Sequence, residues 1–581
     1  MKLSKTALIL TFLVILAFSL RLYSAHHVDL ATDEMIYSLI PLNIISAERL
    51  STVEQSPVYF YLADLGYKLL GGLTAISSRF TSVIYGSLAA ILIYLLTLEL
   101  FGRKKEALLA AFFAAVSGYI LHFSIEMDMV AYFFSLFAAY YFIIAWKRDA
   151  NKYFYFSFVL ASLAVLIKSI ALIFFIVLLF ALVIKLWLKD GSAVVSAEIK
   201  RPKKGLIIIA VCLLLSLVIV SPVLIYNYLL YQDKGITDYY FSVIGGVGET
   251  VHQGLQGKPW TLSRLSQISQ GKLQQFLTLD GPLLIFGIIG LALSFKKERW
   301  PTVLLLFLIA IPFIYLAGQT SSASHYLFVP LFLSIFAGHS AVVIGQTVKD
   351  KFRFRHFILL VMIITSIFTI TTLVKIEKLR EQSIVLSLQS YAQDTIPDNA
   401  LIVIDPRIYN GIHAWVFNKQ HYLAGISFPQ LLNQLEGYSG ATVTAPLYYI
   451  ECSGKTYCGW KPEDFDRISK SGEELSAYFQ ERLVKIYELK SEHQFSIYRG
   501  EIKIPPAVYE AVDRTHQFWF YPVGWKYPEN AVDNYTTDGL AEKMLNKIGF
   551  TVLYLDVLMA LLAILLTLWL GLRTRELVEK K

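Results

Sequence analysis

Ionisable and polar side chains lie beside apolar segments at several places in the chain. A charge beside such a segment costs free energy and is usually functional. The residues in question are Asp33, Glu34, Arg79, Glu126, Asp128, Lys168, His325 and Tyr326. A carboxylate at a membrane–water boundary can deprotonate a hydroxyl group or hold a divalent cation, and a Lys, Arg or His beside it can neutralise a phosphate. Lipid phosphates lie at that depth. The set therefore indicates transfer of a group from a lipid-linked phosphate to an acceptor outside the membrane.

Each of these residues also has a structural alternative. Asp33 and Glu34 could cap a helix, and Lys168 could extend its amine toward lipid headgroups. Arg79 and the His325-Tyr326 pair could be interfacial anchors. Anchors alone would be richer in Lys and Arg and poorer in paired acids than this set is. The joint pattern therefore favours one polar pocket at the outer membrane face, acidic at one end and basic at the other.

The composition indicates a membrane protein. Of the 581 residues, 56% are hydrophobic and 17% are charged, whereas soluble domains have roughly 45–50% and about 25%. This balance excludes a soluble cytosolic enzyme and a disordered chain, and three cysteines exclude a disulfide-framed mini-domain. The chain has no P-loop, GxGxxG, HExxH or GxSxG motif, so nucleotide-binding, zinc-protease and serine-hydrolase functions have no support.

About twelve apolar runs are long enough to cross a bilayer as helices. They lie near 6–24, 79–100, 107–122, 129–146, 153–167, 170–188, 205–226, 281–295, 301–318, 326–347, 357–374 and 549–571. Basic residues recur in alternate connections, near 2–5, 103–105, 147–152, 189–204, 296–299, 349–355 and 573–581. Basic loops face the cytoplasm, so both termini are expected inside. This use of the basic residues also explains the net charge of +8 without nucleic acid. An even number of spans is required, and ten would fit almost as well as twelve.

The chain is thus expected to be a polytopic α-helical membrane protein with three regions. A transmembrane catalytic domain spans 1–374, with outer loops at 25–78 and 227–280. An extracytoplasmic mixed α/β domain spans 375–548, and a last membrane helix with a cytoplasmic tail spans 549–581. In the middle region Cys452 and Cys458 are six residues apart and could form a local disulfide outside the cell, the alternative being two free thiols.

In order and spacing, the polar motifs resemble those of the GT-C superfamily of polyprenyl-phosphate-sugar glycosyltransferases. The likeness is to the branch that holds protein O-mannosyltransferases and bacterial aminoarabinose transferases. The matching segments are Asp33-Glu34-Met35-Ile36-Tyr37, Gln55-Ser56-Pro57-Val58-Tyr59, Arg79-Phe80 with Gly86, Phe101-Gly102, Ser124-Ile125-Glu126-Met127-Asp128, Leu166-Ile167-Lys168-Ser169, and His325-Tyr326 with Pro330.

The chain departs from this pattern at three points. Gln55-Ser56 replaces a basic residue and a first proline, so another residue must contact the lipid phosphate if the basic residue does so in relatives. His325 stands where arginine is common. The Trp-Trp-Asp-Tyr-Gly motif of oligosaccharyltransferases is absent from the sequence, which disfavours transfer of a whole oligosaccharide to asparagine.

The resemblance implies a GT-C-like fold and an inverting transfer of a sugar from a polyprenyl-phosphate monosaccharide to a protein, glycan or lipid. Asp33 would be the general base, with the adjacent Glu34 as its rival. The further residues expected to contact substrate are Tyr59, Arg79, Glu126, Asp128, Lys168, Arg264, His325 and Tyr326. Lys168, assisted by His325 and Tyr326, would stabilise the lipid phosphate.

The sequence establishes no cofactor, and a divalent metal, Mg²⁺ or Mn²⁺, held by Asp33 and Asp128 is an open alternative. The expected partners are the lipid-linked donor, an extracytoplasmic acceptor and the bilayer, with no nucleic acid. We expect a multi-pass protein of the plasma or inner membrane with its active site on the outer face. A transporter or flippase of lipid-linked sugars is the alternative function, and a non-catalytic receptor is a third. Transporters usually place charges near the midplane of the bilayer within internal repeats, neither of which is seen here.

Overall fold

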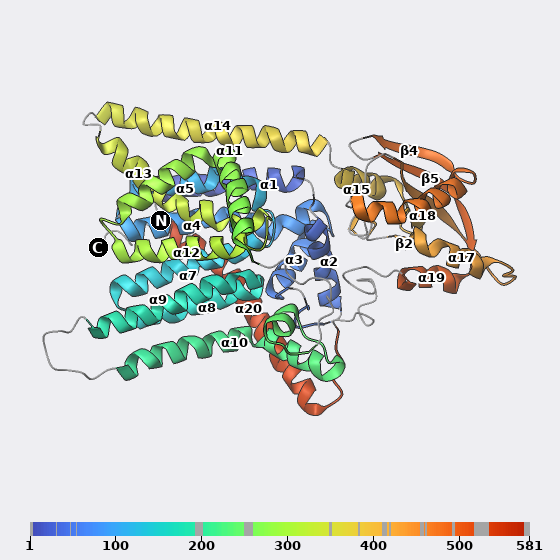
Figure 1. Ribbon diagram of the computed structural model, residues 1–581, viewed down its shortest axis with the longest axis horizontal. Helices are drawn as coiled ribbons and strands as arrows, with labels where there is room; N and C mark the ends of the chain where they lie inside the picture. The colour runs from blue at the N-terminus through green and yellow to red at the C-terminus, as the bar shows by residue number, and fades with distance from the viewer. Residues whose placement is uncertain are drawn as a thin grey trace. The chain divides into compact units, whose positions relative to one another are not determined.

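The computed structural model describes residues 4–573 apart from 29, 31, 47, 54, 192–201, 249–259, 348–350, 382–383, 409–414, 418–419, 454–457, 459–461, 491–493 and 516–533. The chain forms two compact units. We call residues 1–26, 50–376 and 535–581 the membrane unit, and residues 27–49 and 377–534 the sheet unit. Figure 1 labels the elements of both.

The membrane unit is a helical bundle. Ten helices among the described residues are long and apolar enough to cross a membrane. They are α1 (Lys5–His27), α4 (Ala75–Phe101), α7 (Asp128–Arg148), α9 (Leu172–Gly191) with the short turn η1 (Ser169–Ala171), α10 (Pro202–Lys234), α11 (Leu262–Ser294), α12 (Arg299–Ala317), α13 (Phe328–Thr347) with the turn η3 (Ser324–Tyr326), α14 (Lys351–Glu381) and α20 (Leu540–Leu572). The shorter elements are α3 (Val58–Leu70), α5 (Lys104–Val116), α6 (Gly118–Phe123), α8 (Asn151–Ile167) and the turn η2 (Tyr240–Ile244).

All twelve apolar runs are helical over most of their length, and the expected polytopic fold is confirmed. Two runs fall short of a full span. The run at 153–167 is α8, and the run at 107–122 is divided at Ser117 into α5 and α6. The division is held by Asp280, which accepts hydrogen bonds from the backbone N–H groups of Gly118 at 2.7 Å and Tyr119 at 3.0 Å. These are two of the unpaired donors that every helix start leaves.

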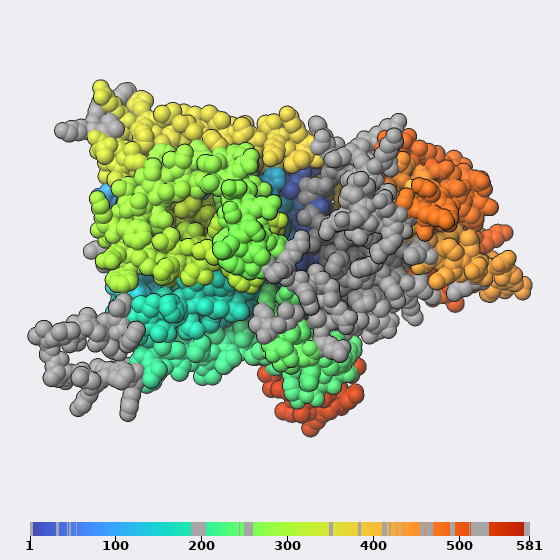
Figure 2. Space-filling view, in the orientation of Figure 1, coloured from blue at the N-terminus to red at the C-terminus, as the bar shows by residue number. Residues whose placement is uncertain are grey.

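Lipid-facing and buried helices differ in which residues they expose. Helix α14 exposes large apolar side chains at intervals of three or four residues, and it lies along one edge of the membrane unit (Figures 1 and 2). The exposed side chains include Leu360, Ile363, Ile367, Ile370 and Val374. Helices α4, α7 and α13 are buried along most of their length. Gly338 of α13 packs so closely on α5 that a Cβ there would lie 2.5 Å from Ala110 N, as small residues allow in membrane bundles.

The sheet unit contains five strands in the order β2-β1-β3-β5-β4. The strands are β1 (Leu401–Ile404), β2 (His421–Ala424), β3 (Val443–Cys452), β4 (Val484–Lys490) and β5 (Gln494–Ile504). β1 pairs in parallel with β2 and β3, whereas β5 is antiparallel to β3 and β4. The helices and turn of the unit are α2 (Thr32–Ser46), α15 (Ile384–Thr395), η4 (Gly425–Ser427), α17 (Phe428–Leu435), α18 (Pro462–Gln480) and α19 (Pro506–Thr515). The core joins apolar side chains of the sheet to those of α17, α18 and α19.

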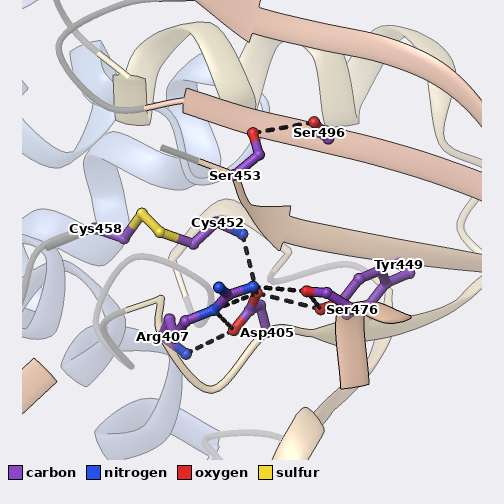
Figure 3. Close-up of a disulfide and its surroundings, with 8 residues drawn as sticks. All are labelled: Asp405, Arg407, Tyr449, Cys452, Ser453, Cys458, Ser476 and Ser496. Carbon is purple, nitrogen blue, oxygen red and sulfur yellow. Dashed lines mark hydrogen bonds and ion pairs between the residues drawn. A yellow bond between two sulfur atoms is a disulfide. The ribbon is translucent and has the colours of Figure 1, made fainter. Parts of the chain in front are cut away.

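A disulfide and a buried ion pair lie where β1 and β3 end (Figure 3). The sulfur atoms of Cys452 and Cys458 are bonded to each other. Asp405, directly after β1, accepts hydrogen bonds from Arg407 Nε at 3.0 Å and from the backbone N–H of Cys452 at 3.1 Å. Burial raises the pKa of Asp405, and the bonds from Arg407 oppose that effect. Tyr449 OH also donates to this carboxylate, at 3.2 Å.

Replacing Asp405 with asparagine is expected to destabilise the sheet unit by about 3 kcal/mol, because it leaves the Arg407 charge buried without its counter-ion. The measurement is hydrogen exchange of the β1 and β3 amides in the full-length protein, read by mass spectrometry. Glu481→Gln is the control, since Glu481 forms an exposed ion pair with Arg482 and such pairs contribute little. Equal exchange rates in the two variants would contradict a structural role for Asp405.

Candidate active site

Asp128 is the centre of a buried charge cluster in the membrane unit. Its Oδ2 atom accepts a hydrogen bond from Lys168 Nζ at 2.6 Å, and its Oδ1 atom lies 2.9 Å from His325 Nδ1. The Asp128 side chain is fully buried, and those of Lys168 and His325 are 7% and 22% exposed. The three residues come from three different helix connections. We call them the Asp128 cluster.

Local structure fixes the position of each member. Asp128 begins α7, and Tyr132 lies one turn later on the same face, where its hydroxyl donates to the His325 carbonyl at 2.6 Å. α7 therefore holds His325 by both side chain and backbone. Lys168 follows the last residue of α8 and precedes η1, and its backbone is extended. It is therefore part of neither helix.

An apolar cavity of about 1150 Å³ is lined at one end by Lys168, which precedes α9, and by His325, which shares Asp128 with it. At the other end it is lined by Trp146 and Trp300, near the place where Lys185 of α9 lies over the Trp146 ring. Between these ends, side chains of α9 and α12 line it, and the lining of α9 continues as far as Ile184. From Ser169 to Ile184 a helix rises about 22 Å, a large part of the hydrocarbon thickness of about 30 Å. The cavity is thus a long groove with a polar end. We call it the α9–α12 groove.

Further polar groups surround the cationic end of the groove. Ser169 and Tyr240 both line it, and the Ser169 hydroxyl donates to Tyr240 OH at 2.5 Å. Tyr240 begins η2, whose first turn is capped by Asp238: its Oδ1 accepts from the backbone N–H of Tyr240 at 3.0 Å. Asn227 of α10 donates to Asp238 Oδ2 at 2.8 Å. The segment around η2 is therefore tied to α10 and brings the Tyr240 hydroxyl to Ser169, the residue after Lys168.

Three residues expected to contact substrate hold helices together instead of lining the groove. Tyr59 OH donates to the Ser78 carbonyl at 3.2 Å, and Arg79 Nη1 donates to the Ala25 carbonyl at the end of α1, at 2.8 Å. The Glu126 carbonyl accepts from Ser82 Oγ at 2.8 Å. The last of these contacts ties α4 to the turn that leads into Asp128.

Tyr326 and Arg264 lie in the membrane unit but outside the groove lining. Tyr326 is buried, and its hydroxyl donates to the Thr320 carbonyl at 2.7 Å. The nearby Lys272 of α11 lies over the Tyr326 ring and donates to the Ser321 carbonyl at 2.6 Å. Arg264 stands in the first turn of α11, and its Nη1 is buried with no hydrogen-bond partner among the described residues. Lys272 fixes the segment before His325 and was not expected from sequence.

Asp33 and Glu34 lie in the first turn of α2, in the sheet unit. Glu34 is buried, whereas the Asp33 side chain lies outside the described residues. The metal alternative paired Asp33 with Asp128. Both oxygens of Asp128 are engaged by nitrogen groups, and the described part of the chain holds no group of three or more His, Cys, Asp or Glu suited to a metal ion. The described residues therefore do not fit a divalent ion at Asp128.

The sequence analysis named Asp128, Lys168 and His325. It did not predict the groove, whose polar end is formed by Lys168 and His325. Its apolar lining on α9 and α12 has the same composition as a lipid-facing surface. Ser169 was named in the Leu166–Ser169 motif but not as a residue of the site. Tyr240 could have been noticed because it belongs to an aromatic pair, Tyr239-Tyr240, in the segment 227–280.

Comparison with known proteins gives one family match and several similar folds. Residues 54–226 match the family model described as dolichyl-phosphate-mannose-protein mannosyltransferase. The curated proteins give no significant match. The structure is similar to ArnT from Cupriavidus metallidurans bound to undecaprenyl phosphate, at 12% identity and a TM-score of 0.56, covering 85% of this chain and 97% of that one. ArnT in the apo state gives 11% identity and a TM-score of 0.54, covering 84% and 97%.

These findings agree with the motifs. The chain has a GT-C glycosyltransferase fold of the ArnT type, and the resemblance to the branch of O-mannosyltransferases and aminoarabinose transferases is confirmed. It is an integral, multi-pass membrane protein.

Proposed function

We propose that the protein transfers a monosaccharide from a polyprenyl phosphate to an acceptor on the extracytoplasmic side, with inversion at the anomeric carbon. One observation supports this most strongly: the α9–α12 groove is long and apolar and ends at Lys168 and His325. A polyprenyl phosphate has the same two parts, an apolar tail and an anionic head. The similar ArnT structure contains undecaprenyl phosphate.

In the proposed reaction an acceptor hydroxyl attacks the anomeric carbon as the bond from that carbon to the phosphate oxygen breaks. The hydroxyl proton passes to Asp33. This role is assigned because Asp33 matches the acidic position of the GT-C motif Asp33-Glu34-Met35-Ile36-Tyr37. The departing lipid phosphate keeps the bonding electrons and needs no proton. Lys168 and His325 stabilise its negative charge, which is the kind of electrostatic stabilisation that contributes most in many enzymes.

Asp128 acts as a positioning residue. It does not line the groove, and both of its oxygens are bonded to Lys168 and His325, which do. Because Nδ1 of His325 faces Asp128, Nε2 is the ring nitrogen left for the phosphate. The step requires no metal, since the residues present supply the positive charge.

The function is tested with purified protein in liposomes and a panel of polyprenyl-phosphate monosaccharides, with hydroxyl-bearing peptide, glycan and lipid acceptors and with or without a chelator. We expect transfer of at least one sugar, with inverted configuration and unaffected by the chelator. Transbilayer movement of the donor without transfer to any acceptor would overturn the proposal in favour of a flippase.

Filling the groove is expected to weaken binding of long-chain donors selectively. Ala181 lines the groove, so Ala181→Trp should displace the tail and raise KM for a long polyprenyl donor about tenfold, as a strain of 1–3 kcal/mol implies. A donor with a short tail should be affected little. Steady-state kinetics with both donors measure the difference.

The matched control is Val183→Trp. Val183 is exposed on the same helix and does not line the groove, so its KM should stay near that of the wild type. An equal rise in KM for short and long donors in Ala181→Trp, or the same rise in Val183→Trp, would show that the groove does not hold the tail.

A further inference from the structure

The sheet unit contains a polar cavity of about 500 Å³ at the edge of its sheet. This volume is within the usual range for small-molecule sites, about 300–1,000 Å³. The cavity reaches Arg407 in the segment after β1, and Cys452 and Ser453 where β3 ends. We call it the β1–β3 cavity.

Its place in the fold is one where open α/β sheets bind ligands. β1 and β3 are parallel neighbours. The chain leaves β1 toward β2 on one side and leaves β3 toward β4 on the other. Connections thus diverge between the carboxyl ends of β1 and β3, and ligands of such sheets bind in the crevice at that point.

Most of the side chains that line the cavity are polar, and some of them are buried. Glu473, Ser476, Ala477 and Gln480 of α18 line it, and their spacing of three, four and seven puts them on one helix face. Gln494, Ser496 and Tyr498 of β5 also line it, and alternate residues share one face of a strand. Ser496 is fully buried. Ser476 is buried as well. Polar side chains at these two buried positions indicate binding, since packing alone would favour apolar residues.

Donors and acceptors in the cavity are held in fixed positions. Asp405 binds Arg407 through two nitrogens, and Arg407 Nη2 also donates to Ser476 Oγ at 2.6 Å (Figure 3). Glu451 accepts hydrogen bonds from Gln480 at 2.7 Å and Tyr498 at 2.9 Å. Burial raises the pKa of Tyr498 to about 12, so its hydroxyl keeps the proton that it donates.

The charges exclude several ligand classes. Three carboxylates and two cations line the cavity, and Arg407 is already paired with Asp405, so an anion would be repelled. Lys485 pairs with Glu488, and Glu451 is occupied by Gln480 and Tyr498, which leaves no described set of acids for a metal ion. A lining this polar does not suit an apolar ligand. A neutral molecule with many hydroxyl groups, each both donor and acceptor, matches the mixture.

We propose that the β1–β3 cavity binds a neutral oligosaccharide. The class of ligand is inferred from the cavity itself. Its role, to hold a glycan acceptor or glycosylated product for the transferase, rests on the proposed function.

The test uses the full-length protein in nanodiscs and a panel of neutral di- and trisaccharides, with sulfated and sialylated counterparts, monitored by saturation-transfer-difference NMR. We expect at least one neutral sugar to bind. Ala477→Trp should weaken that binding at least tenfold, because Ala477 is exposed, lines the cavity and can be enlarged without disturbing the core. Ser471→Trp is the control, since Ser471 is exposed on α18 but does not line the cavity.

A second pair of variants removes one acceptor without adding bulk. Glu473→Gln should weaken binding several-fold, and Glu474→Gln should not, because only Glu473 lines the cavity. The proposal is overturned if no neutral sugar binds, if only anionic sugars bind, or if Ala477→Trp binds as the wild type does. Binding that persists in Lys168→Met, whether or not any transfer is found, separates this site from the proposed function.

Discussion

Lys168→Met is expected to lower kcat/KM for sugar transfer by about 10³-fold. Removing one preorganised donor from a developing negative charge costs about 10²–10³ in rate, and loss of donor affinity adds to this. Lys168 lines the groove and is the cationic partner of a fully buried acid, with 2.6 Å between Nζ and Oδ2. Initial rates at several donor concentrations, with wild type and variant in the same liposomes, give the ratio.

The variant also removes a partner from a buried ion pair, which alone can destabilise a protein by about 3–5 kcal/mol. The double variant Lys168→Met/Asp128→Asn separates the two effects, because it removes the acid as well as the base. We expect the double variant to regain much of the thermal stability lost in Lys168→Met and none of the transfer activity. Recovery of transfer in the double variant would show that Lys168 has a structural role only.

The membrane fold could be read from the sequence because a span is a local property. An apolar run of about 20 residues can be recognised without knowing which segments it packs against, and all twelve runs are helical over most of their length. The interruption of the helix at Ser117 was not predicted. It depends on a carboxylate that is 163 positions away in the chain, where Asp280 Oδ2 accepts from the Ser117 hydroxyl at 2.5 Å.

The residues of the Asp128 cluster were predicted from the sequence, but the ion pairs between them were not. Asp128, Lys168 and His325 stand out because charges beside apolar runs are rare. Which acid binds which base depends on how α7, α8 and η3 pack, and no single segment carries that information. Arg79 stands out for the same reason as Lys168, yet its described hydrogen bond goes to a helix end at Ala25. Burial of a charge alone does not distinguish a ligand contact from a structural contact.

In the sheet unit, too, contacts between segments that are distant in the chain could not be predicted. Mixed α/β structure was expected between 375 and 548, and β1 and β3 lie in that range. The order of the strands was not foreseen because sheet pairing joins residues that are far apart in the chain. Asp405 therefore could not be matched with the backbone of Cys452, 47 positions away. The β1–β3 cavity follows from that pairing.

Asp33→Asn is expected to lower kcat by about 10²–10⁴, the usual contribution of a positioned general base. Asparagine keeps the size of the side chain but cannot accept the proton of the acceptor hydroxyl. KM for the lipid donor should change little, because Lys168 and His325 are proposed to bind the phosphate. Steady-state kinetics with the donor and acceptor varied in turn measure both parameters.

Glu34→Gln is the matched control, since it makes the same change at the next position of the same helix. Adjacent helical residues point about 100° apart, so only one of the two carboxylates can face a given acceptor. Glu34 is buried, so Glu34→Gln should reduce stability more than catalysis and leave kcat within about tenfold of the wild type, which corresponds to about 1.4 kcal/mol. The opposite outcome, with Asp33→Asn active and Glu34→Gln inactive, would move the base to Glu34. Near-normal transfer by both variants would remove the general base from α2 altogether.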